Sequence, residues 1–158
     1  MVTIELRTFI AAPPERVFDL SRSIDLHRHS LAHTGEEAIA GRTSGLIGPG
    51  ETVTWRARHL GVRQRLTVRI AGYDRPRWFR DELVRGAFAS MAHDHYFDTC
   101  DGGTGMRDVF QFSAPLGPLG RLMERLVLRA YLTRLLAHRN AAIKAAAEGE
   151  GWRKLLRE

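Results

Sequence analysis

The chain has 158 residues and a single cysteine, so its length fits one domain, and Cys100 excludes an internal disulfide or a cysteine-based zinc cluster. The formal net charge is +6, and residues 115–158 supply +5 of it, with nine basic and four acidic side chains. Because 22 of the 24 basic residues are arginines spread along the chain, and no nucleic-acid-binding motif accompanies them, we expect no nucleic-acid partner. With no bilayer-spanning apolar run and no leader pattern, we expect a cytoplasmic protein.

The chain opens with a strand and short helices. Ile4, Leu6 and Ile10 alternate with polar residues, which predicts a strand that ends before Pro13 and Pro14. Residues 15–29 then favour one or two short helices. Residues 41–50 hold four glycines and a proline and are predicted to form a loop, which is either a lid at a cavity mouth or a plain connector.

Residues 52–70 predict a hairpin with a two-residue turn at Leu60 and Gly61. This register pairs Trp55 with Leu66 and Val53 with Val68 on the inner face, and Arg58 with Arg63 and Arg56 with Arg65 outside. Since like charges that face each other destabilise a sheet, we expect this outer arginine ladder to recruit acidic neighbours or a bound anion.

A second hairpin, within residues 88–113, carries the candidate chemistry. An even-length turn at residues 101–103 places His95 directly opposite Asp108 on the inner face, with His93 two residues away on the same side. A carboxylate beside an imidazole orients its tautomer and raises its basicity, as in a general base. The alternatives are a buried polar pair that only holds the sheet, and a contact with a ligand.

The strand that begins at Trp78 contains two adjacent carboxylates, which must point to opposite faces. A three-residue turn at residues 85–87 would place Phe79 and Asp81 on the inner face with His93, whereas a two-residue turn would place Glu82 there. His93 and His95 could share a metal ion with Asp81 or Asp108 as third ligand. No fixed-spacing signature accompanies them, so we predict no metal site and no cofactor.

The last long element is a basic helix that begins near Pro118 and ends near Gly149. One apolar stripe is assigned to the sheet, and it comprises Leu119, Leu122, Met123, Leu126, Val127, Ala130, Ala137 and Ala141. Four further leucines, at positions 128, 132, 135 and 136, could line a cavity, be covered by the tail that starts at Trp152, or meet a second subunit. We predict a homodimer that buries part of this leucine surface, Leu132 included. Contact with a membrane surface is not expected of a helix committed to the core.

Several segments of the chain carry a family resemblance. AAPPERVFDL after the first strand, ETVTWRARHLG, YDRPRWFRDELVRGAF, HDHYF, GGTGMRDVFQF and PLGPLGRLMERLVL resemble the START, birch-pollen-allergen and polyketide-cyclase superfamily, often called SRPBCC. The resemblance implies an α+β helix-grip fold, in which a curved seven-stranded antiparallel sheet wraps around the C-terminal helix and two short helices follow the first strand. It covers a single domain at residues 1–147, which leaves residues 148–158 as a tail.

The leading functional expectation is a protein that binds a hydrophobic or aromatic small molecule, such as a lipid, quinone or polyketide, in a cavity of about 300 to 1,000 Å³. The expected contacts of that ligand are Val53, Trp55, His59, Leu66, Phe79, Asp81, His93, His95, Phe97, Met106, Asp108 and Phe110. The alternative is a cyclase or dehydratase in which His95, oriented by Asp108, removes a proton next to a carbonyl. A third alternative is an interaction protein that acts through its basic C-terminal helix.

Overall fold

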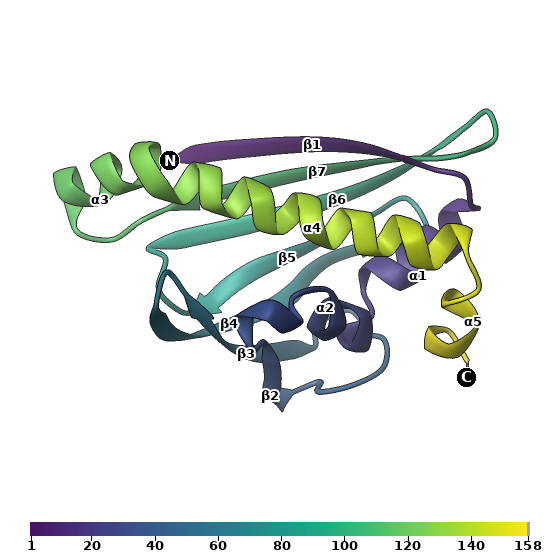
Figure 1. Ribbon diagram of the computed structural model, residues 1–158, viewed down its shortest axis with the longest axis horizontal. Helices are drawn as coiled ribbons and strands as arrows, with labels where there is room; N and C mark the ends of the chain where they lie inside the picture. The colour runs from purple at the N-terminus through teal and green to yellow at the C-terminus, as the bar shows by residue number, and fades with distance from the viewer. Residues whose placement is uncertain (158) are drawn as a thin grey trace.

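The computed structural model describes residues 1–157 and contains one seven-stranded, fully antiparallel sheet crossed by a long C-terminal helix (Figure 1). The strand order is β1-β7-β6-β5-β4-β3-β2, so only β1 is out of chain sequence. The strands are β1 (Val2–Ile10), β2 (Glu37–Gly41), β3 (Thr52–His59), β4 (Val62–Asp74), β5 (Trp78–Arg85), β6 (Ser90–Cys100) and β7 (Gly103–Ser113). The expected α+β helix-grip fold is confirmed.

Two short helices connect the first strand to the rest of the sheet. They are α1 (Pro14–Ser21) and α2 (Ile24–Ser30), and the single turn η1 (Ala32–Thr34) follows them. Pro14 stands in the first turn of α1, where a missing N–H costs nothing, and the Ser23 hydroxyl caps α2 by accepting from the backbone N–H of Leu26 at 3.2 Å. Both helices lie on the same side of the sheet as the C-terminal helix (Figure 1).

The registers of both predicted hairpins are confirmed. Trp55 pairs with Leu66 across β3 and β4, and His95 pairs with Asp108 across β6 and β7. The pairing of β4 with β5 shifts at two places, and such bulges curve a sheet. At one of them Gly72 is required, because a Cβ there would lie 2.2 Å from the ring of Trp78. The resulting curvature leaves room between the sheet and the helices.

The C-terminal helix consists of α3 (Gly117–Met123), the π-helical turn η2 (Glu124–Leu128) and α4 (Arg129–Glu148). Its buried positions are Gly120, Glu124, Leu136, Arg139, Asn140, Ile143 and Ala147. Glu124 accepts a hydrogen bond from the backbone N–H of Ala114, and Gly120 lets α3 approach the carbonyl of Pro115. In the part of the chain that the structure describes, no helix is long and apolar enough to cross a membrane.

The predicted orientation of this helix is wrong. The stripe assigned to the sheet is largely solvent-exposed, with Leu119 at 59% and Leu126 at 67% of their full exposure. The stripe is exposed both before the π turn and after it, where Ala137 and Ala141 are exposed, so the turn does not account for the error. The helix has two apolar sides, and the side that includes Leu136 and Ile143 is the one that packs on the sheet. The α3 end also lies at the end of the molecule opposite the C-terminus rather than over the core (Figure 1).

The remaining segments pack locally. The loop at residues 42–51 is tied to the helices, because Gly45 accepts from the N–H of Ile24 and Ile47 donates its N–H to the carbonyl of Arg22. The tail contains α5 (Trp152–Leu155), and the guanidinium of Arg16 lies 4.0 Å from the ring centroid of Trp152. The tail therefore packs beside α1, and its last residue, Glu158, lies outside the described residues.

Candidate functional site

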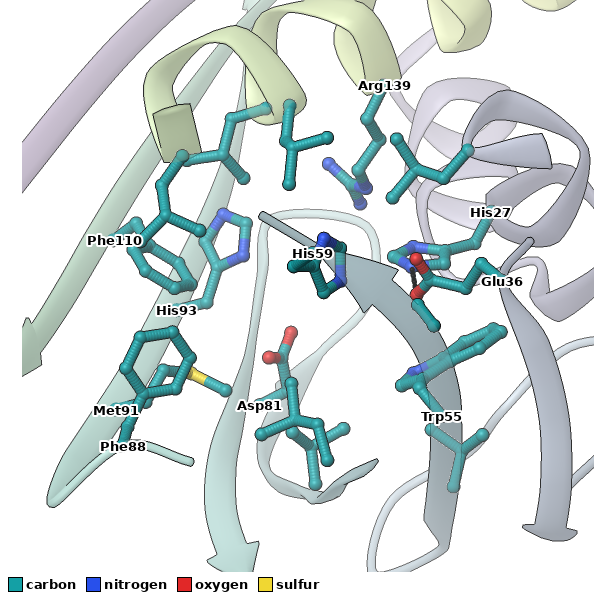
Figure 2. A pocket seen from close by; sticks show the side chains of 18 of the residues that line it. His27, Glu36, Trp55, His59, Asp81, Phe88, Met91, His93, Phe110 and Arg139 are labelled. Carbon is teal, nitrogen blue, oxygen red and sulfur yellow. Dashed lines mark hydrogen bonds and ion pairs between the residues drawn. The ribbon is translucent and has the colours of Figure 1, made fainter. Parts of the chain in front are cut away.

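A cavity of about 350 Å³ lies between the curved sheet and the helices α2 and α4 (Figure 2). Its apolar walls include the expected Val53, Trp55, Leu66, Phe79 and Phe110. The helix contributes Leu128, Leu132, Leu135 and Leu136, so these four leucines line the cavity, which was one of the three alternatives. His59, Asp81, His93 and His95 are the expected polar residues that also line it.

Three residues expected in the cavity do not line it. Phe97, Met106 and Asp108 are almost fully buried, but they lie outside the lining. Helix α1 covers this part of the sheet, because the Phe18 ring packs edge-on against Phe97 at 5.3 Å and the Ser21 hydroxyl lies 3.7 Å from the sulfur of Met106. Phe97 and Met106 are therefore core residues, and Asp108 lies behind the two imidazoles.

Asp108 is the centre of a buried polar network. Its Oδ1 accepts from Nε2 of His93 at 2.9 Å, and its Oδ2 accepts from the side-chain amide of Asn140 at 2.7 Å. Nδ1 of His95 lies 3.1 Å from the same Oδ1, but without the alignment of a hydrogen bond. The guanidinium of Arg139 is 3.6 Å from Oδ1. We call Asp81, His93, His95, Asp108, Arg139 and Asn140 the His–Asp cluster.

The second carboxylate of the cluster belongs to Asp81. It pairs with His93 across β5 and β6, and its Oδ2 accepts from Nε2 of His95 at 2.8 Å. The connection between β5 and β6 is longer than the three-residue turn at residues 85–87, which would have paired Asp81 with Met91. The side chains nevertheless face as that turn predicted, and Asp81 rather than Glu82 lines the cavity. The His95 ring also stacks on Phe79, with centroids 4.2 Å apart. His95 is thus held by a carboxylate and an aromatic face.

The two imidazoles have opposite electrostatic environments. Burial lowers the pKa of His93, and the neighbouring His95 lowers it further, so His93 is neutral near pH 7. Burial also acts to lower the pKa of His95, but the two carboxylates outweigh it and the pKa is raised. For both Asp108 and Asp81, burial alone would raise the pKa, but hydrogen bonds with the histidines lower it. The pKa values of the two imidazoles are therefore shifted in opposite directions, and Arg139 adds a positive charge near both carboxylates.

This arrangement determines what the cluster offers to a ligand. A carboxylate only accepts, so neutral His93 carries its proton on Nε2 and has a free acceptor at Nδ1. Asp81 offers its second oxygen, and Arg139 offers N–H donors (Figure 2). Such a set matches a group that both donates and accepts a hydrogen bond, such as a hydroxyl.

A metal ion would have to compete with this network. One ligand atom each from Asp81, His93 and His95 lies within 4.8 Å of the others, which is a cluster of the right residue types. However, an ion would have to displace the proton shared by His95 and Asp81, close to the positive charge of Arg139. The expectation of no metal at this position stays a prediction.

Further polar residues line the cavity, and His27 and Glu36 lie across it from His93 (Figure 2). His27 lies 3.0 Å from buried Glu36 and stacks on Trp55, with ring centroids 4.3 Å apart. Nδ1 of His59 lies 2.7 Å from the hydroxyl of Tyr131, which joins the end of β3 to α4. Burial lowers the pKa of His59. The cavity therefore has polar groups in addition to the His–Asp cluster among its apolar walls.

Several of these residues were not predicted from the sequence. Helical spacing could have predicted that Arg139 and Asn140 are buried, because they lie on the same face of α4 as Leu132, Leu136 and Ile143. A polar pair within an apolar helix face indicates a buried polar site. This site was not predicted from the sequence, because the stripe that begins at Leu119 was assigned to the sheet instead. His27, Glu36 and Tyr131 carry no comparable signal, since only the folded chain brings them to one cavity.

Comparisons with known proteins agree with this geometry. A family model described as "Polyketide cyclase / dehydrase and lipid transport" matches residues 1–148. None of the curated proteins matches at a significant level. The chain is similar in structure to the protein TTHA0849 from Thermus thermophilus, with a TM-score of 0.72, 20% sequence identity, and coverage of 92% of this chain and 99% of the other.

Two further solved structures show the same fold. A START superfamily protein from Mycobacterium smegmatis has a TM-score of 0.67 and 10% identity, over 92% of this chain and 97% of the other. The major latex-like protein 151 from Panax ginseng has a TM-score of 0.64 and 14% identity, over 94% of this chain and 98% of the other. These likenesses show that the fold is shared. The family model confirms the polyketide-cyclase part of the resemblance.

Proposed function

The chain belongs to the polyketide cyclase/dehydrase and lipid transport family, and from this membership we propose that it binds a hydrophobic or aromatic small molecule in its internal cavity. The observation that carries the proposal is the cavity itself, which has a usual size for a ligand site, apolar walls and a few convergent polar groups. An apolar ligand would gain most of its binding free energy from the leucine and aromatic walls.

The His–Asp cluster supports a more specific proposal, that the ligand carries a hydroxyl or phenol. Such a group would donate to Asp81 and accept from Arg139, while the walls of Trp55 and Phe110 hold the apolar part. A ligand without that group would leave the half-buried carboxylate of Asp81 without its extra partner. One hydrogen bond to a charged group contributes about 1.5 to 3 kcal/mol, which is roughly a tenfold to hundredfold change in affinity.

Cavity binding can be tested with N-phenyl-1-naphthylamine, a neutral probe that fluoresces in apolar surroundings. Wild type should bind it, and Leu132→Trp, which fills the cavity, should weaken binding about tenfold or more. Leu126→Trp on the exposed side of the same helix is the matched control and should bind as wild type does. No binding by wild type, or equal binding by the two variants, would contradict the proposal.

The polar contact can be tested by calorimetry with two probes of equal size, 2-naphthol and 2-methylnaphthalene. Wild type should prefer the naphthol by about tenfold. Asp81→Leu should abolish that preference while it keeps affinity for the methyl compound. A preference that survives in the variant would show that the hydroxyl binds elsewhere in the cavity.

A proton-transfer function of cyclase or dehydratase type is the second candidate, and the difference between the two imidazoles favours it. We propose His93 rather than the expected His95 as the base, because the carboxylates beside His95 raise its pKa and favour its protonated form. Neutral His93, oriented by Asp108, would instead accept a proton from a carbon next to a carbonyl. Arg139 would stabilise the enolate oxygen that forms.

A further inference from the structure

The mouth of the cavity lies at one end of the molecule. Among the residues that line the cavity, those that are also solvent-exposed are Leu60, Arg65, Ala87 and Pro115. They belong to the β3–β4 hairpin, the β5–β6 loop and the connection from β7 to α3. The cavity therefore opens between two hairpins and the start of the C-terminal helix.

Large apolar side chains are exposed around this mouth. Within residues 1–157, eight of the ten exposed large hydrophobic residues lie on the β3–β4 hairpin, at the end of β5, or between the β7–α3 connection and η2: Leu60, Val62, Val84, Leu116, Leu119, Leu122, Met123 and Leu126. A ninth, Met1, is nearby, because its amino group lies 4.0 Å from Glu124. Exposed apolar surface that is concentrated in one place indicates a surface made for contact.

The arrangement along α3 and η2 shows that this exposure is not accidental. Leu119, Leu122, Met123 and Leu126 follow one another at spacings of three, one and three residues, which places them on one side of the helix. Gly120 and Glu124 are buried on the other side. The segment is thus anchored by its inner side and presents a row of apolar side chains outward.

The same end of the molecule is strongly basic. The arginines at positions 58, 63, 65, 85, 121 and 125 are exposed, and none of them forms an ion pair with a carboxylate of the described chain. The expectation that the outer arginine ladder recruits acidic neighbours holds only for Arg56, which bonds to Glu37. Residues 54–72 contain no acidic residue, and Glu124, the acid of residues 109–134, is buried.

We propose that the mouth end of this protein docks on the surface of an anionic lipid bilayer. Leucine side chains can insert at the boundary of the acyl chains, and arginine side chains can pair with the lipid phosphates at the same depth. Both interactions favour binding to an anionic bilayer. This surface, which we call the mouth face, consists of the eight apolar residues and six arginines named above. Membrane contact was not expected of leucines committed to the core, but the leucines of α3 are exposed, so that objection does not apply to them.

A second copy of the chain fits the mouth face less well. A two-fold symmetric dimer through this surface would place each set of unpaired arginines against its own copy, and like charges that meet in an interface repel. A bilayer with anionic headgroups supplies the opposite charge instead. Docking would also hold the cavity mouth against the acyl chains, so a hydrophobic ligand could transfer without crossing water. This last consequence rests on the proposed ligand binding.

Vesicle co-sedimentation tests the proposal without any ligand. Vesicles of phosphatidylcholine with equal phosphatidylglycerol should bind wild type, and pure phosphatidylcholine should bind it at least about tenfold more weakly. The double variant Leu119→Glu, Leu122→Glu should lose about tenfold or more of its binding to the anionic vesicles. Phe9→Glu, which changes an exposed apolar residue on β1 away from the mouth face, is the control and should bind as wild type does.

Several outcomes would overturn the proposal. Equal vesicle binding by wild type and the double variant would show that the leucines are not inserted. Equal binding to neutral and anionic vesicles would remove the role of the arginines. A wild-type dimer that the double variant dissociates, seen by sedimentation without vesicles, would assign the surface to a second copy. Probe binding by the double variant, measured separately, shows that its fold is intact and distinguishes this proposal from the proposed ligand binding.

Discussion

Replacing Asp108 with asparagine tests whether the buried His–Asp cluster is held together by charge. The change keeps the size of the side chain but removes the negative charge that faces His93, His95 and Arg139. One carboxylate oxygen becomes an amide NH2 group. The N–H donor of either His93 or Asn140 then faces another donor and loses its hydrogen bond. The guanidinium of Arg139 and the imidazole of His95 are left with Asp81 as the remaining carboxylate nearby.

The expected cost follows from these contacts. Removal of one partner from a buried charged network destabilises a protein by about 3 to 5 kcal/mol. A domain of this size has a total stability of about 5 to 15 kcal/mol, so Asp108→Asn should remain folded but become fragile. With a denaturant slope of about 2 kcal/mol per molar of urea, the unfolding midpoint should fall by about 2 M.

Urea unfolding followed by circular dichroism measures this change. Asp98→Asn is the matched control, because Asp98 lies on β6 but is solvent-exposed, and it should change stability by less than about 0.5 kcal/mol. A cost below about 1 kcal/mol for Asp108→Asn would refute the view that the carboxylate compensates buried charges.

The pH dependence gives an independent check. The pKa of Asp108 is lowered in the folded protein, so its carboxylate stabilises the fold above about pH 4 and this contribution is lost as the pH falls through the folded value. The difference in stability between wild type and Asp108→Asn should therefore shrink in acid. Loss of the carboxylate should also lower the pKa of His95, which NMR titration of the imidazole measures.

Two further predictions concern chemistry and curvature. If His93 is a general base, wild type should speed deuterium exchange at the carbon next to the carbonyl of 1-tetralone, which NMR can follow. The His93→Gln variant should lose roughly a hundredfold of that rate. Exchange by wild type that is no faster than exchange in buffer would exclude this second function. Gly72→Ala should lower the free energy of unfolding in urea by about 1 to 3 kcal/mol, because the new methyl group meets the ring of Trp78. Gly105→Ala is the control, because the nearest atoms to its new methyl group lie at 3.8 Å, and it should change that free energy by less than about 0.5 kcal/mol.

Local pattern determined much of the fold and part of the site. Strand alternation and the two-residue turn at Leu60 and Gly61 set the register of β3 and β4, because a shift of one residue would turn every apolar side chain outward. The same reasoning paired His95 with Asp108 correctly. The order of elements indicated an antiparallel sheet crossed by one long helix, whereas the seven-stranded α+β helix-grip architecture was implied by the family resemblance.

Tertiary structure decided which of the paired residues face the cavity. Phe97 and Met106 lie on the inner side of the sheet as expected, yet α1 fills the space above them, and no local pattern states where a packed helix ends and a cavity begins. The choice between Asp81 and Glu82 depended on a turn length that residues 85–87 do not specify. Asp108 joined His93 rather than His95 in its well-aligned hydrogen bond, because ring orientation is set by packing against Phe79.

The C-terminal helix shows the physical limit most clearly. Its apolar residues were correctly identified, but they occupy two sides of the helix, and periodicity alone cannot say which side meets the sheet. The side that includes Leu136 and Ile143 is buried, and the α3 end extends from the core, so the stripe that includes Leu119 and Leu126 is exposed. Residue composition makes a helix amphipathic, whereas only the packing of the whole chain decides which apolar side is buried and which is left for a partner.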